Sequence, residues 1–272
     1  MHKISIRKAV NACYRAAVII TLLSFIGMSV TASAAVLDED GIQLQVIWTE
    51  QDENIGKVLF SRFENEGWTV PLLLHETSTD VFHAVSCAGN SGEIYAVWTQ
   101  QKHDHYTLIW TKYERGKWKS PEEIHTGLSN NRSSTLMNDA DGTLWLAWTS
   151  TEGKYTDVYI SYLQGNSWSR PKKVHPDNNV PDIEPQLSFD GGHGLILSYQ
   201  TIDNHEYVTV AKRWTGAEWE RMDSNDTSYI AKSMDFRSNG EAIYPSFIEE
   251  QFAAHIFIKK RNGALSIPLS KL

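Results

Sequence analysis

The chain has 272 residues, 41% of them hydrophobic, and a formal net charge of −8. An acidic chain lacks the positive face that nucleic acids and anionic membrane surfaces require, so neither is expected as a partner. The length suits one domain with a sizeable core.

The N-terminus has the pattern of an export signal. A basic segment and a short apolar run precede the small residues Ala32-Ser33-Ala34, which predicts a secretory signal peptide over residues 1–34. The alternative is an uncleaved anchor, although the apolar run is short for a lasting span. Residues 35–272 are then a single exported domain, periplasmic or extracellular. Because only Cys87 remains in it, an intramolecular disulfide is excluded.

The mature region repeats with a period of about 50 residues, a length typical of propellers and other repeat folds. Two tryptophan series carry the period, each followed by a second repeated residue type, and a histidine closes each unit. The fourth copy slips by one residue, with Tyr199 and Trp219 in the tryptophan positions, and the fifth is more degenerate. The repeated positions are Trp48, Trp98, Trp148, Trp68, Trp118, Trp168, Thr49, Thr99, Thr149, Pro71, Pro121, Pro171, His75, His125 and His175.

Each repeat reads as four short strands. In the third, residues 134–139, 143–149, 157–163 and 167–174 are strand-like and are separated by polar or Gly/Asn turns. Four strands in about 50 residues predict an all-β propeller, with five blades of four antiparallel strands from the turn pairs and six as the alternative. A β-sandwich is the rival fold, but it gives no reason for a constant tryptophan spacing.

The turn after the third strand resembles that of sialidase-type, Asp-box (BNR-type) propellers. Their Ser-x-Asp-x-Gly-x-Thr-Trp pattern is kept here at the Ser/Thr, Gly and Trp positions, as in Ser161, Gly165 and Trp168. The aspartate position instead holds Phe63, Tyr113 and Leu163. The resemblance implies a sialidase-like propeller superfamily fold. It does not carry sialidase activity, because the arginine cluster that binds the substrate carboxylate in that family has no counterpart.

A functional site is expected where the repeats differ, since positions free of shared packing can vary. The first residues of the inner strands should surround a central channel. The resulting candidate ligand-binding residues are His83, Arg132, Glu184 and Tyr229, joined by Asp104 and His105 from a neighbouring loop. The alternative is a set of solvated loop residues with no ligand.

Metal and catalytic interpretations are weaker. His103-Asp104-His105 could hold a metal, but a polar surface loop explains it better, and no metal or cofactor is expected. Glu184 and Asp203 are the candidate carboxylates of a glycosidase, if they lie within about 5–10 Å of each other. The repeated His75, His125 and His175 are interpreted as structural. Trp110, Trp145 and Trp214 stand outside the two series and are expected to be exposed stacking surfaces, with packing between blades as the alternative for Trp145.

The favoured function is a non-catalytic module that binds a carbohydrate or another polar cell-envelope ligand. The aromatic content, 11% of residues, supplies stacking surfaces for sugars. A glycoside hydrolase using channel-mouth carboxylates is the alternative, and a protein-interaction scaffold is the second alternative. A deep acidic pocket would favour the enzyme, and a flat apolar face would favour the scaffold.

Overall fold

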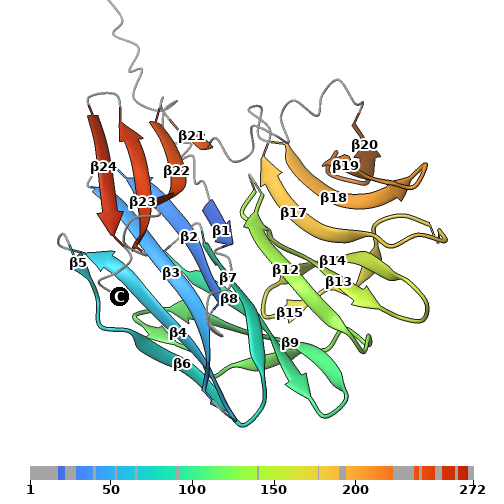
Figure 1. Ribbon diagram of the computed structural model, residues 1–272, viewed down its shortest axis with the longest axis horizontal. Helices are drawn as coiled ribbons and strands as arrows, with labels where there is room; N and C mark the ends of the chain where they lie inside the picture. The colour runs from blue at the N-terminus through green and yellow to red at the C-terminus, as the bar shows by residue number, and fades with distance from the viewer. Residues whose placement is uncertain are drawn as a thin grey trace, which may run out of the picture.

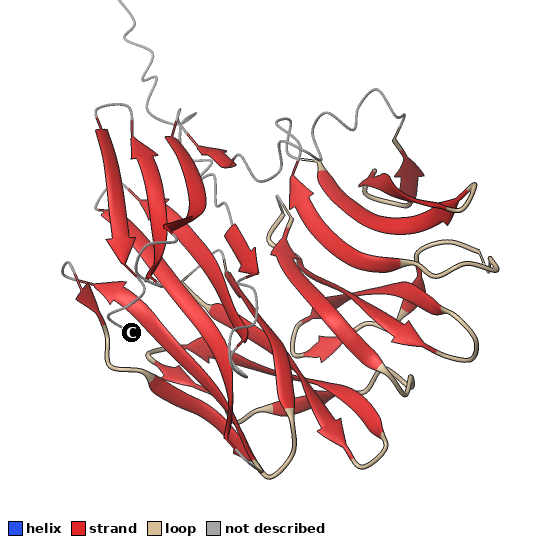
Figure 2. Cartoon of the chain, in the orientation of Figure 1, coloured by secondary structure: helices blue, strands red, loops and turns tan. Residues whose placement is uncertain are grey.

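The computed structural model describes most of the chain from residue 41 to 222, with short gaps, and shorter segments on either side. These segments are residues 18–21, 29–38, 41–52, 54–64, 67–89, 92–139, 141–176, 178–189, 194–222, 236–238, 241–248, 253–260 and 263–268. Every regular element within them is a β-strand (Figures 1 and 2). The described part of the chain contains no helix long and apolar enough to span a membrane.

The strands form five antiparallel sheets in chain order, which confirms the predicted all-β class. The first three sheets follow the tryptophan period. They comprise β1 (Val18–Thr21), β2 (Ser29–Asp38), β3 (Gly41–Asp52), β4 (Ile55–Glu64), β5 (Gly67–Trp68) and β6 (Leu72–Thr77); β7 (Val81–Ala88), β8 (Ile94–Lys102), β9 (His105–Glu114), β10 (Lys117–Trp118) and β11 (Glu122–Ile124); and β12 (Asn131–Asn138), β13 (Leu144–Thr151), β14 (Thr156–Gln164), β15 (Ser167–Trp168) and β16 (Lys172–Lys173).

The last two sheets have four strands each. They comprise β17 (Ile183–Phe189), β18 (Leu195–Asp203), β19 (Glu206–Trp214) and β20 (Trp219–Arg221); and β21 (Phe236–Ser238), β22 (Glu241–Ile248), β23 (Ala253–Lys260) and β24 (Gly263–Pro268). The first strands of successive sheets contact one another, β2 with β7, β7 with β12 and β12 with β17, which is a propeller-like arrangement (Figure 1). The number of blades in a closed ring stays a prediction.

Sequence reasoning places the strands of the third repeat within a few residues of their observed bounds. The predicted fourth strand is the exception, because it is split into β15 and β16 by residues 169–171. Pro171 lies in this gap, and a proline cannot donate a backbone hydrogen bond to the ladder. Pro71 and Pro121 lie in the corresponding gaps of the first two repeats.

The first tryptophan series lies in the core, as predicted, and the second is partly buried against it. Trp98 and Trp148 are fully buried within their sheets. The second series packs across sheet junctions: Trp118 meets Phe60 of the first sheet edge-on with ring centroids 5.0 Å apart, and Trp168 meets Trp110 of the second sheet at 5.6 Å. Such pairs contribute beyond the area that they bury.

The expected exposure is wrong for Trp110, and Trp145 follows the alternative of packing between sheets. Trp110 and Trp145 are only 6% and 5% exposed. Trp145 packs against Trp214 and Trp219 with centroids 4.9 and 5.8 Å apart. Their strands face a neighbouring sheet, so departure from the period marks a different packing partner and not a ligand surface.

A hydrogen bond across the β-hairpin explains why Ser or Thr recurs in the third strand. The hydroxyls of Ser61, Thr111 and Ser161 donate to the backbone carbonyls of Thr69, Lys119 and Ser169, at 2.8, 2.7 and 2.7 Å. These three hydroxyl-bearing side chains are buried, so an unmade bond would leave a polar group without water.

Replacing Ser161 by alanine is therefore expected to lower the free energy of unfolding by about 1 kcal/mol. Denaturant unfolding followed by tryptophan fluorescence measures the change. The control is Ser167→Ala, because Ser167 is exposed in the same hairpin. An equal loss in both variants would contradict the role given to the Ser161 bond.

The first sheet includes residues of the predicted signal segment. The β2 strand pairs with β3 from Ser29 opposite Thr49 to Asp38 opposite Gly41, so six of its residues precede the predicted cleavage point. Cleavage after Ala34, and with it export, stays a prediction that N-terminal sequencing of the secreted protein can test.

Candidate functional site

A left-handed bulge interrupts the inner strands β7, β12 and β17 near their starts. The register shifts between Phe82 and Val85, between Arg132 and Thr135, and between Ile183 and Gln186. Within these bulges His83, Ser133 and Glu184 have φ angles of 54°, 50° and 53°. Non-glycine residues seldom adopt this conformation, and it concentrates at functional sites.

We call the face at which β7, β12 and β17 begin the mouth. The bulges there change which residues of the three strands are equivalent. His83 and Glu184 occupy equivalent bulge positions, as expected, but the third equivalent is Ser133. Arg132 lies one residue earlier, because the bulge inserts its extra residue after it. Tyr229 lies outside the described residues.

Arg132, Tyr106, Phe82 and His83 form one cluster at this mouth, the Arg132 platform. The Arg132 guanidinium carbon lies 3.8 Å from the centroid of the Tyr106 ring and 6.0 Å from that of Phe82. Phe82 contacts Tyr106 and His83 edge-on, with centroids 5.3 and 5.5 Å apart. The cluster thus joins the second sheet to the third.

Backbone contacts hold the platform in place. The Tyr106 amide donates to the carbonyl of Ser129 at 2.9 Å, in the segment leading into β12. The buried Asn131 side chain donates to the Tyr106 carbonyl at 3.1 Å and accepts from the Trp148 indole at 2.8 Å. Tyr106 and Arg132 are therefore positioned by the same loop, which the period alone does not reveal.

The electrostatics of the platform favour an anionic ligand. Arg132 is exposed and has no ion pair with any carboxylate in the described part of the chain. Stacking on an aromatic face leaves guanidinium N–H donors available. Surrounding protein atoms displace water from the His83 ring, and this loss of hydration lowers the pKa of His83. The nearby positive charge of Arg132 lowers it further, so a neutral imidazole is favoured.

The remaining predicted site residues do not join the platform. Asp104 is at the tip of the β8–β9 turn with its side chain 97% exposed, and its carboxylate lies 3.4 Å from Nδ1 of His105. Within the described ranges, neither Glu184 nor Asp203 has a side-chain hydrogen bond or ion pair with the platform, and both are exposed. The hypothesis that they form a catalytic pair stays a prediction.

The repeated histidines contact the following sheet. His75 bonds the Gln100 amide oxygen at 3.1 Å and lies against Trp98, with centroids 5.4 Å apart. His175 stacks on Tyr199 of the fourth sheet, with ring centroids 5.7 Å apart. Tyr199 occupies the position that Trp98 has in the second sheet. These contacts agree with a structural role for both, whereas His125 is exposed.

Comparison with known proteins shows similarity of fold. No protein-family model matches the sequence, and no curated protein is similar to it. Among solved structures, a protein of unknown function from Dyadobacter fermentans is 12% identical, with 96% of this chain and 81% of that chain covered and a TM-score of 0.51. An ulvan lyase of polysaccharide lyase family PL25, bound to -[GlcA(1-4)Rha3S]-, is 10% identical, with 88% of this chain covered and a TM-score of 0.54.

This chain spans 65% of that lyase. An endo-arabinase from Bacteroides thetaiotaomicron is also similar, at 10% identity, with 86% of this chain and 92% of that chain covered and a TM-score of 0.44. The ulvan lyase and the endo-arabinase are carbohydrate-active enzymes. At these identities the likeness concerns the fold, and the sialidase-type resemblance stays a prediction.

Proposed function

We propose that this protein is an exported carbohydrate-binding propeller whose ligand is an acidic glycan, and that the Arg132 platform binds it. The observation that carries the proposal is an exposed, unpaired Arg132 stacked on Tyr106 beside His83. A guanidinium binds a carboxylate or sulfate with two parallel hydrogen bonds. Tyr106 and Phe82 supply aromatic surface for a sugar ring.

The net negative charge of the chain repels polyanions from most of its surface. A polyanion is therefore expected to bind at a localised site where a cation is exposed. The ulvan lyase, whose TM-score is 0.54, was solved with a glycan that contains a uronic acid and a sulfated sugar. That likeness supports the choice of ligand class. The platform, not the likeness, identifies the residues.

The test is binding to polyuronate and to a neutral polysaccharide, measured by affinity electrophoresis and calorimetry. Arg132→Gln should weaken polyuronate binding about tenfold or more, because hydrogen bonds to a charged group contribute about 1.5–3 kcal/mol. The matched control is Arg115→Gln, which removes the same charge from an exposed residue beyond the opposite end of β9. Equal binding by all three proteins would refute the assignment.

Binding of the acidic glycan is also expected to strengthen as pH falls. The pKa of His83 is below its ordinary value of 6.5, so the ring is neutral near pH 7 and gains a proton only at lower pH. A second positive charge beside Arg132 then attracts the anion, whose carboxylates stay ionised at about pH 5. His83→Gln should abolish this increase. A persisting increase would show that a group other than His83 causes it.

A catalytic use of the same platform is the second candidate. A neutral His83 beside Arg132 has the groups that β-elimination on a uronate needs. Arg132 would neutralise the carboxylate, and His83 would remove the proton on the adjacent carbon. The electron pair would form a carbon–carbon double bond, the bond to the glycosidic oxygen would break, and the Tyr106 hydroxyl would protonate the leaving oxygen.

Ultraviolet absorbance of the unsaturated product separates the two candidates. If the protein only binds polyuronate, no absorbance of an unsaturated product appears at any protein concentration. A lyase gives absorbance that His83→Gln abolishes while polyuronate binding at pH 7 persists. Release of reducing ends without absorbance would point instead to hydrolysis, with Glu184 and Asp203 as the residues to replace.

A further inference from the structure

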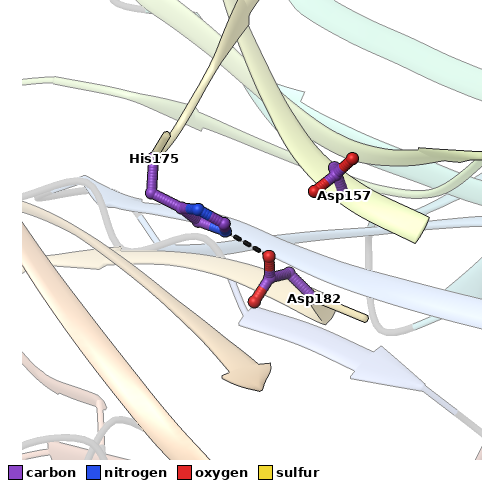
Figure 3. Close-up of side chains that lie close together, drawn as sticks. All are labelled: Asp157, His175 and Asp182. Carbon is purple, nitrogen blue, oxygen red and sulfur yellow. Dashed lines mark hydrogen bonds and ion pairs between the residues drawn. The ribbon is translucent and has the colours of Figure 1, made fainter. Parts of the chain in front are cut away.

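A second polar cluster lies at the junction of the third and fourth sheets, apart from the residues of the Arg132 platform. Asp157 is near the start of β14, His175 follows β16, and Asp182 immediately precedes β17 (Figure 3). One ligand atom from each of the three lies within 4.8 Å of the other two. We call these three residues the His–Asp cluster.

The cluster is buried, which separates it from an ordinary polar surface. Asp182 is 0% exposed and Asp157 is 8% exposed. The His175 side chain is 12% exposed. Carboxylates are removed from water at a substantial cost unless they are paired, hydrogen-bonded or bound to a metal.

The corresponding positions at the preceding junctions carry no acidic residue. Two residues before the bulge, the three repeats carry Val81, Asn131 and Asp182. The position of Asp157 is occupied by Lys57 in the first sheet and by Thr107 in the second. Two acidic groups thus appear at one junction only among these repeats, so the shared packing of the sheets does not require them.

The hydrogen bonds of His175 leave its other nitrogen facing a carboxylate. The Nδ1 atom lies against the carbonyl oxygen of Pro176, which can only accept, so Nδ1 carries the proton. This is the arrangement in which a histidine ligates a metal through Nε2. Here Nε2 points at the Asp182 carboxylate, as Figure 3 shows. Two atoms that each present a lone pair repel each other at contact distance unless a proton or a metal ion lies between them.

The two carboxylates have oxygen atoms to offer. Oδ1 of Asp182 is buried and has no hydrogen-bond partner within the described residues. Its Oδ2 accepts a hydrogen bond from the Asn178 amide at 3.3 Å. Lys173 holds Oδ2 of Asp157 at 2.8 Å, which leaves the other oxygen of that carboxylate for a ligand.

We propose that the His–Asp cluster binds a divalent transition-metal ion of the zinc class, with Nε2 of His175 and carboxylate oxygens of Asp157 and Asp182 as its protein ligands. Adjacent ligands of a tetrahedral zinc with bonds of about 2.0–2.1 Å lie about 3.3 Å apart, which small side-chain rotations from the present spacing can reach. Water completes the coordination.

The donor set selects the kind of metal. An imidazole nitrogen with two carboxylates suits zinc and its first-row neighbours, whereas calcium takes six to eight oxygen ligands. A metal at this place joins β14 to the segment between β16 and β17, so it cross-links the third and fourth sheets. This goes beyond glycan binding and departs from the sequence-based expectation that no metal is bound.

The experiment is zinc titration of the purified full chain after treatment with a chelator, followed by calorimetry and by metal analysis of the desalted protein. The expected result is one zinc ion per chain, a higher melting temperature with zinc, and weaker binding of calcium. His175→Gln and Asp182→Asn should each weaken zinc binding by about a hundredfold or more. If Asp182→Asn fails to fold, Asp157→Asn provides the same test from another element.

Two controls locate the metal. His75→Gln removes the equivalent repeated histidine, which bonds neutral Gln100, and should leave zinc binding unchanged. Replacing His103 and His105 by Gln removes the exposed His-x-His turn and should also have no effect. The proposal is overturned if the unmodified chain binds no zinc, or if the turn variant, and not the cluster variants, loses it.

Discussion

Replacing Trp148 by alanine is expected to lower the free energy of unfolding by about 3–5 kcal/mol, as truncation of a buried aromatic residue does. The side chain is fully buried in the core cluster formed by the second, third and fourth sheets. Its indole nitrogen donates to Asn131 at 2.8 Å, so the alanine variant leaves a cavity, and the buried Asn131 amide oxygen keeps only the long contact with the Thr126 hydroxyl at 3.4 Å. Equilibrium unfolding in urea measures the change.

Two phenylalanine variants separate the cavity from the hydrogen bond. Trp98 is as deeply buried as Trp148, but its indole nitrogen has no hydrogen-bond partner in the described part of the chain. Trp148→Phe should therefore cost about 1 kcal/mol more than Trp98→Phe. Equal losses in the two variants would show that the Asn131 bond contributes nothing to stability.

Replacing Asp182 by alanine is expected to destabilise the metal-free protein by a similar amount, about 3–5 kcal/mol, because it leaves a partly buried cation without its partner. Asp182 is 0% exposed, and its carboxylate raises the pKa of His175. Urea unfolding with a chelator present, at a pH below the raised pKa, measures the loss.

The matched control is the exposed pair of Asp104 and His105, whose separation is 3.4 Å. Asp104→Ala should cause no measurable loss, since water replaces the carboxylate as the partner of His105. An equally small loss of stability in Asp182→Ala and Asp104→Ala would contradict this prediction, because it would mean that His175 becomes neutral when Asp182 is removed. In that case, also replacing His175 by alanine should cause no further loss of stability.

The strands were predictable because their signals are local. Alternating residues and turn pairs lie within a single repeat, and the strands of each repeat pair mainly with one another. The chain therefore indicates the first three strands of a unit without knowledge of its neighbours. Pro171 also carried a signal for the split between β15 and β16, since it cannot complete the ladder.

The candidate site was only partly predictable, because its contacts cross between repeats. Arg132 and His83 were selected as positions that vary, but the stacking of Arg132 on Tyr106 depends on how the loop before β12 meets the second sheet. The His–Asp cluster was missed because His175 was interpreted only as a repeated residue. The available signal was Asp182, an acid at a position where other repeats carry Val81 and Asn131.

The left-handed bulges have a consequence for how such a protein diversifies. The register shift on each inner strand places its bulge residue in the same conformation whether that residue is His83, Ser133 or Glu184. The backbone there does not depend on one side chain, so each copy of a duplicated repeat can acquire a different residue without changing the ladder around it. Successive duplications thereby create several surface positions that mutate independently, and new combinations of side chains can arise while the fold is inherited intact.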